Sequence, residues 1–175
     1  MSYSPTTPAT GARGLQGVVH VGTWNCTAWS AERFAVVAAL GAAVLALQET
    51  KLARIPLEHA QGAARTRGYT LHHGAAVPAT RADLHGERSG VAFLTAPGVA
   101  VAPLPPQGAA WRRLHGTHRL HGVVIPRRPG LPHGMRIFTV YAPLRCYPAL
   151  REAFDRYFLD LIFSLDLAVP TLDDI

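Results

Sequence analysis

Three polar side chains each follow an apolar, strand-like run, and their chemistry suits the binding of a divalent cation beside a phosphoester. Asn25 comes directly after the β-rich run Val18–Trp24, Glu49 comes just past the run Ala43–Leu47, and Tyr141 ends a third run. A carboxylate and an amide oxygen form half of the oxygen-ligand set that Mg²⁺ takes together with substrate phosphate. Tyr141 would add a hydroxyl at the same ends of the strands.

The elements that must position Asn25 and Glu49 are a strand, a short helix and a second strand. Ser30 is a favourable helix N-cap, apolar residues follow it at helical spacing, and Gly41 supplies a helix stop. A βαβ unit of this kind has parallel strands, and adjacent strands lie roughly 4.8 Å apart. Both side chains can therefore reach one point above the carboxyl ends of the sheet, where open α/β folds keep their sites.

The rest of the chain predicts short elements within one domain, residues 17–175, which a disordered tail over residues 1–16 precedes. The expected elements are a weak helix at Leu57–Arg67, strands at Tyr69–His73 and Ser89–Leu94, a polar loop at Arg81–Arg88, an edge or loop at Pro97–Gln107, a hairpin of Arg119–Ile125 with Arg136–Tyr141, an amphipathic helix at Ala149–Leu165 and a strand beginning at Leu167–Leu172. The amphipathic helix has the most regular apolar periodicity of these elements.

The composition fits one globular domain with an anionic partner. Of 175 residues, 49% are apolar and 16% are charged, which argues against disorder and against a coiled coil. Residues 1–150 carry fifteen basic and five acidic residues, a net charge of +10, whereas residues 151–175 carry two and six, a net charge of −4. Arginine pairs two phosphate oxygens at once, so this basic body suggests nucleic acid or a phosphoester as the partner. A coding bias toward Ala, Gly, Pro and Arg would explain the arginines equally well.

Nothing at the N-terminus looks like a secretory signal, because Met1–Thr10 is uncharged and rich in Ser, Thr and Pro. The uncharged stretch Phe34–Leu47 has fourteen residues, fewer than the ~20 that cross a bilayer. We therefore expect an intracellular protein, nuclear or cytoplasmic, that does not bind a membrane. Cys26 and Cys146 are too few for a disulfide scaffold, and we expect reduced bystanders near the strand ends.

Four motifs in a fixed order resemble those of the endonuclease/exonuclease/phosphatase superfamily. They are Thr23-Trp24-Asn25, Leu45–Lys51 (LALQETK), Ser89–Leu94 (SGVAFL) and Val140–Pro143 (VYAP), so the resemblance spans residues 18–143. The QETK form together with YAP is most similar to apurinic-site endonucleases and to the endonuclease domains of non-LTR retrotransposons. The resemblance implies an α+β fold, an α/β sandwich of two mixed β-sheets flanked by helices, here incomplete at the C-terminus.

The resemblance also implies metal-dependent hydrolysis of a phosphodiester, with the nicking of DNA as the reaction. Glu49 would bind Mg²⁺ or Mn²⁺ directly, and Asn25 would help to hold the metal or its water. Tyr141 would be the catalytic hydrogen-bond donor to the scissile phosphate, and Lys51 and Arg145 would bind the incoming phosphates. The metal would offset negative charge that grows on the phosphate and the leaving oxygen.

Two motifs of the superfamily are missing from the sequence. A GDxN motif and a C-terminal aspartate-histidine pair are absent, the sequence stops at Thr171–Ile175, about where the first should begin, and Leu144 replaces an Asn common in apurinic-site enzymes. We therefore expect the N-terminal part of a retroelement-type endonuclease domain with poor or no activity by itself, since positioned proton transfer supplies ~10²–10⁴-fold. A truncated domain should expose the apolar faces of Phe154, Phe158 and Ile162 and self-associate.

Other interpretations stay open. The same fold could act on a phosphoinositide or another phosphoester, or the chain could be an inactive remnant that binds nucleic acid through its arginines. Asn25 could simply close a turn, Glu49 could be a solvated carboxylate and Tyr141 a half-buried strand aromatic. Lys51 and Arg145 could be ordinary surface charges.

The histidines raise the question of a zinc site. His115, His118 and His121 are spaced by three, which a helix would place on one face, whereas the apolar residues that follow His118 indicate a strand, on which His118 faces away from the other two. Zinc needs three or four convergent ligands. We therefore expect solvated or loop histidines.

Overall fold

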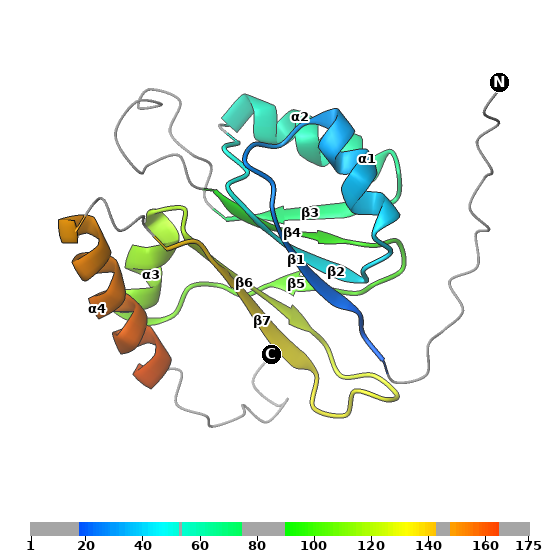
Figure 1. Ribbon diagram of the computed structural model, residues 1–175. Helices are drawn as coiled ribbons and strands as arrows, with labels where there is room; N and C mark the ends of the chain where they lie inside the picture. The colour runs from blue at the N-terminus through cyan, green and yellow to red at the C-terminus, as the bar shows by residue number, and fades with distance from the viewer. Residues whose placement is uncertain (1–17, 53, 75–89, 143–147, 165–175) are drawn as a thin grey trace, which may run out of the picture.

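The computed structural model describes residues 18–52, 54–74, 90–142 and 148–164, which form two β-sheets with helices packed outside them (Figure 1). In chain order the elements are β1 (Val21–Asn25), α1 (Ala31–Ala39), β2 (Val44–Gln48), α2 (Arg54–Arg65), β3 (Thr70–His73), β4 (Val91–Thr95), β5 (Ala102–Pro103), α3 (Gly108–Gly116), β6 (Leu120–Ile125), β7 (Met135–Val140) and α4 (Pro148–Ser164). The predicted α+β class is confirmed.

The first sheet is mixed and contains the predicted βαβ unit. Its strand order is β1-β2-β4-β3, with β1 parallel to β2 and with β4 antiparallel to both of its neighbours. Helix α1 joins the parallel pair, and Ser30 caps it by accepting a hydrogen bond from the Arg33 backbone N–H, as predicted. The register pairs Asn25 with Gln48, so β1 and β2 end side by side and the residue after β2 emerges next to Asn25.

The second sheet has the order β5-β6-β7 and is antiparallel throughout the described residues. The predicted hairpin is confirmed as β6 and β7, which pair from Leu120 with Val140 to Ile125 with Met135. The proline-rich stretch forms the two-residue edge strand β5, in keeping with the expected edge or loop. Tyr141 comes directly after β7, and its N–H donates to the Arg119 carbonyl oxygen.

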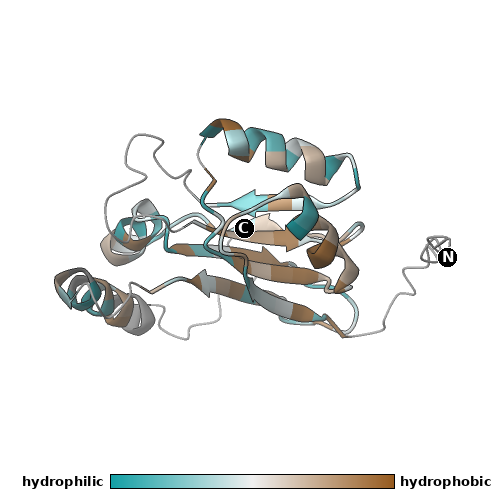
Figure 2. Cartoon of the chain, turned by 45° about the horizontal axis from the view of Figure 1, so that its top comes forward, coloured by the Kyte–Doolittle hydropathy of each residue, from teal (hydrophilic) through white to brown (hydrophobic). Residues whose placement is uncertain are grey.

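Alternation along β2 builds two cores on the two faces of the first sheet. Leu45 and Leu47 face α1 and α2, where they pack with Phe34 and Val37. Val44 and Ala46 face the second sheet and contribute to a second core. Burial of one large apolar side chain contributes about 1.5–3 kcal/mol, so these two faces hold the layers together. Figure 2 shows the apolar colour gathered in the central strands and more polar positions on the outer helices.

Helix α3 lies over the second sheet and was not predicted. It begins and ends at glycine and follows a proline-rich stretch, which obscures its helical pattern. Its Trp111 and Leu114 are buried with Leu120 and with Phe154 of α4. The expectation that Phe154 lies exposed is therefore wrong, because the unpredicted helix covers it.

Several expectations fall outside the described residues, namely the tail over 1–16, the loop Arg81–Arg88 and the strand beginning at Leu167. Within the described part of the chain, no helix is long and apolar enough to cross a bilayer.

Candidate metal and phosphate site

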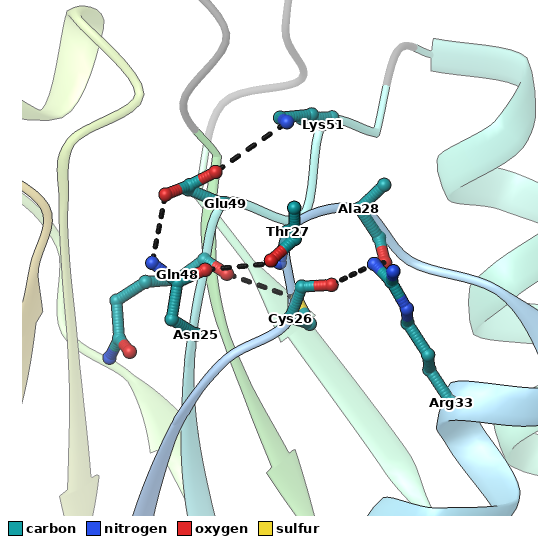
Figure 3. A network of polar contacts seen from close by, with 8 residues as sticks. All are labelled: Asn25, Cys26, Thr27, Ala28, Arg33, Gln48, Glu49 and Lys51. Atoms are coloured by element: carbon teal, nitrogen blue, oxygen red, sulfur yellow. Dashed lines mark hydrogen bonds and ion pairs between the residues drawn. The ribbon is translucent and has the colours of Figure 1, made fainter.

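The structure brings Asn25 and Glu49 into contact at the ends of β1 and β2, as the parallel arrangement predicts. The Asn25 Nδ2 donates a hydrogen bond of 2.8 Å to the Glu49 Oε1 (Figure 3). Glu49 adopts a left-handed backbone conformation with φ of +54°, and Lys51 does the same with φ of +53°. Non-glycine residues in this region cost of order 1–3 kcal/mol and cluster at functional sites. The strained backbone at Glu49 turns its carboxylate toward Asn25 of β1.

Asn25 uses both ends of its amide. Its Oδ1 accepts the backbone N–H of Thr27 at 3.0 Å, which closes an Asx turn, while its nitrogen faces the Glu49 carboxylate. The amide oxygen thus turns back to its own backbone, while the amide nitrogen faces the carboxylate. Asn25 acts on the candidate site by holding the carboxylate in place.

Lys51 also contacts the carboxylate. Its Nζ lies 3.5 Å from the Glu49 Oε2, and the side chains of Lys51 and Glu49 are 29% and 18% exposed. Burial by itself raises the pKa of the Glu49 carboxyl, but hydrogen bonds from Asn25, Tyr141 and Lys51, together with the lysine charge, outweigh it and lower this pKa below its ordinary value. Glu49 is therefore an ionised, partly buried carboxylate, which is the state that binds a cation.

Tyr141 reaches the same carboxylate from the second sheet. Burial, followed by the hydrogen bond to Glu49, raises the pKa of the Tyr141 phenol to about 12. The hydroxyl is therefore protonated at neutral pH and serves as a donor. The Arg119 guanidinium lies 5.4 Å from the centre of the Tyr141 ring and donates to the Tyr141 carbonyl oxygen at 3.2 Å. Three strands thus bring an amide, a carboxylate and a phenol to one point.

Arg119 was missed as a residue of this region. It is buried, whereas the sequence pattern predicts only that it begins a strand. The hairpin register could have identified it, because pairing of Leu120 with Val140 places Arg119 beside Tyr141. Arg145 and Cys146, expected near the site, lie outside the described residues.

The loop after β1 is anchored beneath the site. Cys26 is buried, its Sγ donates to the Gln48 carbonyl oxygen at 3.0 Å, and burial raises the pKa of its thiol to about 11. The Arg33 guanidinium donates to the Cys26 and Ala28 carbonyl oxygens (Figure 3). The cysteine therefore packs as a protonated thiol and offers no nucleophile.

The histidines behave differently from the expectation. His115 lies in α3, but His121 lies on β6 and is only 3% exposed, and neither of its ring nitrogens has a hydrogen-bond partner among the residues that the structure describes. The expectation of solvated or loop histidines is therefore wrong for His121, because its strand face packs against the first sheet. Over the described residues, no group of three or more His, Cys, Asp or Glu could hold a metal ion.

Among the described contacts of this site, Glu49 is the one carboxylate, so these residues do not form a complete metal-binding cage. Magnesium keeps several waters and commonly takes one or two carboxylates together with substrate phosphate. Glu49 supplies one ionised carboxylate, and its contacts come from Asn25, Lys51 and Tyr141. The remaining ligands would be water and phosphate.

The sequence matches no protein-family model, and no curated protein sequence matches it either.

Proposed function

We propose that this chain carries the metal- and phosphate-facing part of a phosphodiester hydrolase site, with DNA as the substrate class. The observation that carries the proposal is the set of contacts at the Glu49 carboxylate. It accepts hydrogen bonds from Asn25 of β1 and from Tyr141, which follows β7, and it forms an ion pair with Lys51 of its own loop. The order of the four sequence motifs supports the same function. So does the net charge of +10 over residues 1–150, which suits a polyanion.

Each residue has a distinct part in the proposal. Glu49 would hold Mg²⁺ or Mn²⁺, and the bound cation would offset charge that develops on the phosphate and the leaving oxygen. Asn25 keeps the carboxylate oriented. The protonated Tyr141 hydroxyl would donate to a phosphate oxygen, and Lys51 would add positive charge beside it.

The proposal includes a low rate. The contacts described for Glu49 come from an amide, a lysine and a phenol, and none of them brings a second carboxylate or an imidazole to take a proton from water. A positioned general base typically contributes ~10²–10⁴-fold, so we expect slow hydrolysis from these residues alone.

Nicking of supercoiled plasmid with Mg²⁺ or Mn²⁺ tests the proposal, with Glu49→Gln beside the wild-type chain. Glu58→Gln is a matched control, because Glu58 is an exposed carboxylate whose partner is Arg54 on the same helix. We expect slow nicking by wild type and by Glu58→Gln, and none by Glu49→Gln. Mn²⁺ binding, followed by electron paramagnetic resonance, should be weakened only by Glu49→Gln.

Equal nicking by all three proteins would overturn the proposal, and so would the absence of Mn²⁺ binding by wild type. A soluble phosphoinositide headgroup provides the substrate comparison. Metal-dependent release of phosphate from it without nicking would reassign the substrate class.

A further inference from the structure

A polar bridge crosses from the first sheet to the second directly beneath Glu49. Gln48 follows Val44 and Ala46 on the face of β2 that packs toward the second sheet. Its Nε2 donates to the Thr139 Oγ1 of β7 at 2.9 Å and lies 3.0 Å from the Thr23 Oγ1 of β1. One amide therefore connects three strands that belong to two sheets.

The bridge ends next to the two groups of the candidate site that come from different sheets. Glu49 is the next residue after Gln48. Tyr141 lies two residues after Thr139, and residues two apart on an extended chain share a face. We therefore expect a change in the separation of Gln48 and Thr139 to alter the separation of Glu49 and Tyr141.

Apolar packing alone would not set this separation. The inter-sheet core has apolar members such as Ala46, Phe93 and Val123, and it also holds the buried His121, which is the register partner of Thr139. Hydrophobic contact is non-directional, whereas a hydrogen bond holds its two heavy atoms within a few tenths of an ångström. Thr139 is buried, so its hydroxyl has no bulk water as an alternative partner to Gln48.

We propose that Gln48 and Thr139 are positioning residues, which hold the Tyr141 hydroxyl against the Glu49 carboxylate across the two sheets. Neither residue touches the substrate or the metal in this arrangement. Their catalytic effect rests on the proposed function, whereas their effect on the contact between Tyr141 and Glu49 does not. The test therefore needs one measurement that requires no hydrolysis.

The discriminating pair of variants is Thr139→Val and Thr139→Ser. Valine has nearly the shape of threonine but lacks the hydroxyl, whereas serine keeps it. Gln48→Met is a second variant, which retains length without hydrogen bonding. Thr95→Val is the matched control, because Thr95 is also a buried strand threonine and its hydroxyl donates to the Thr70 carbonyl oxygen, away from Glu49.

The measurement without hydrolysis is ¹³C NMR of ring-labelled tyrosine at neutral pH in the metal-free chain. The Tyr141 resonance is assigned with Tyr141→Phe, and Glu49→Gln shows its position when the hydrogen bond to the carboxylate is lost. We expect Thr139→Val and Gln48→Met to move the resonance toward that position. Thr139→Ser and Thr95→Val should leave it in place.

Hydrolysis supplies the second measurement. Misplacement of a reacting group by about 1 Å can cost on the order of 100-fold, so Thr139→Val should lower kcat by at least about 10-fold with little change in KM. Thr139→Ser should restore kcat. A resonance that shifts in Thr139→Val while wild type shows no metal-dependent nicking would leave the bridge established and the proposed function refuted.

An unmoved Tyr141 resonance in both Thr139→Val and Gln48→Met would overturn the positioning role, whatever their stability. If wild type nicked DNA and Thr139→Val matched its rate, the catalytic consequence would be refuted while the proposed function stood. Equal shifts in Thr95→Val and Thr139→Val would also overturn the inference, because they would show a general response to the loss of a buried hydroxyl.

Discussion

Acid should destabilise this fold through one buried imidazole. His121 lies between the sheets, with ring centres 5.9 Å from His115 and 6.0 Å from Phe93. Burial is the main cause that lowers the pKa of His121 to about 3, and the charges of His115, His73 and His72 lower it further. The folded chain therefore keeps His121 neutral at pH values where an exposed histidine is protonated.

The loss of stability in acid depends on the pKa of His121 in the folded chain and on its pKa in the unfolded chain. The unfolded chain takes up a proton on His121 below about pH 6.5, while the folded chain does not until about pH 3. The stability due to neutral His121 is thus complete above pH 6.5 and is lost as the pH falls toward 3. At pH 5, 1.5 units below the unfolded value, the loss amounts to about 2 kcal/mol.

Urea unfolding at pH 7 and pH 5 measures this loss, with His121→Leu as the variant that cannot titrate. We expect wild type to lose about 2 kcal/mol more than His121→Leu between the two pH values. His59→Leu, a change at an exposed histidine of α2, should behave like wild type. Equal losses in wild type and His121→Leu would refute the reasoning, since the proton would then be taken up elsewhere.

Two further predictions concern the site and the helical layer. Asn25→Ala removes a hydrogen bond that lowers the pKa of Glu49, so this pKa should rise in ¹³C NMR titrations of the carboxyl carbon, and an unchanged pKa would contradict the role given to Asn25. Phe154→Ala should lower the free energy of unfolding by about 3–5 kcal/mol, because Phe154 is buried against α3. Leu159→Ala, at an exposed position of the same helix, should cost less than about 0.5 kcal/mol in the same denaturation assay, and similar costs at both positions would show that α4 does not pack as described.

The layout of strands could be predicted because their signals are local. A capped helix between two apolar runs predicts a parallel pair, and a turn rich in proline and glycine between two β-rich runs predicts a hairpin; both were found. Helix α3 could not be predicted, because its apolar signal is limited to Trp111 and Leu114 between two glycines. Its absence from the prediction also explains the wrong expectation for Phe154.

The candidate site was predictable only where it depends on neighbouring strands of one sheet. The contact between Asn25 and Glu49 follows from parallel pairing, but the direction of the amide depends on the Asx turn to Thr27, in which only the amide oxygen can accept the backbone N–H. The bridge from Gln48 to Thr139 joins residues 91 positions apart and depends on how the sheets stack. No local pattern carries that information.

The Glu49 loop is held in its strained conformation by polar contacts on both sides, and this bears on what the site can do. Thr50, which is buried, donates its N–H to the Gly90 carbonyl oxygen at 3.0 Å, and its Oγ1 lies 2.8 Å from the His73 Nε2. Gln48 is tied to the second sheet on the other side. A carboxylate fixed between two such anchors would have little freedom left to lose if the proposed cation bound, because its orientation is already set by the fold. This is why variants that leave Glu49 intact but release its neighbours are the sharper test of the site: they change the geometry of the carboxylate without removing its charge.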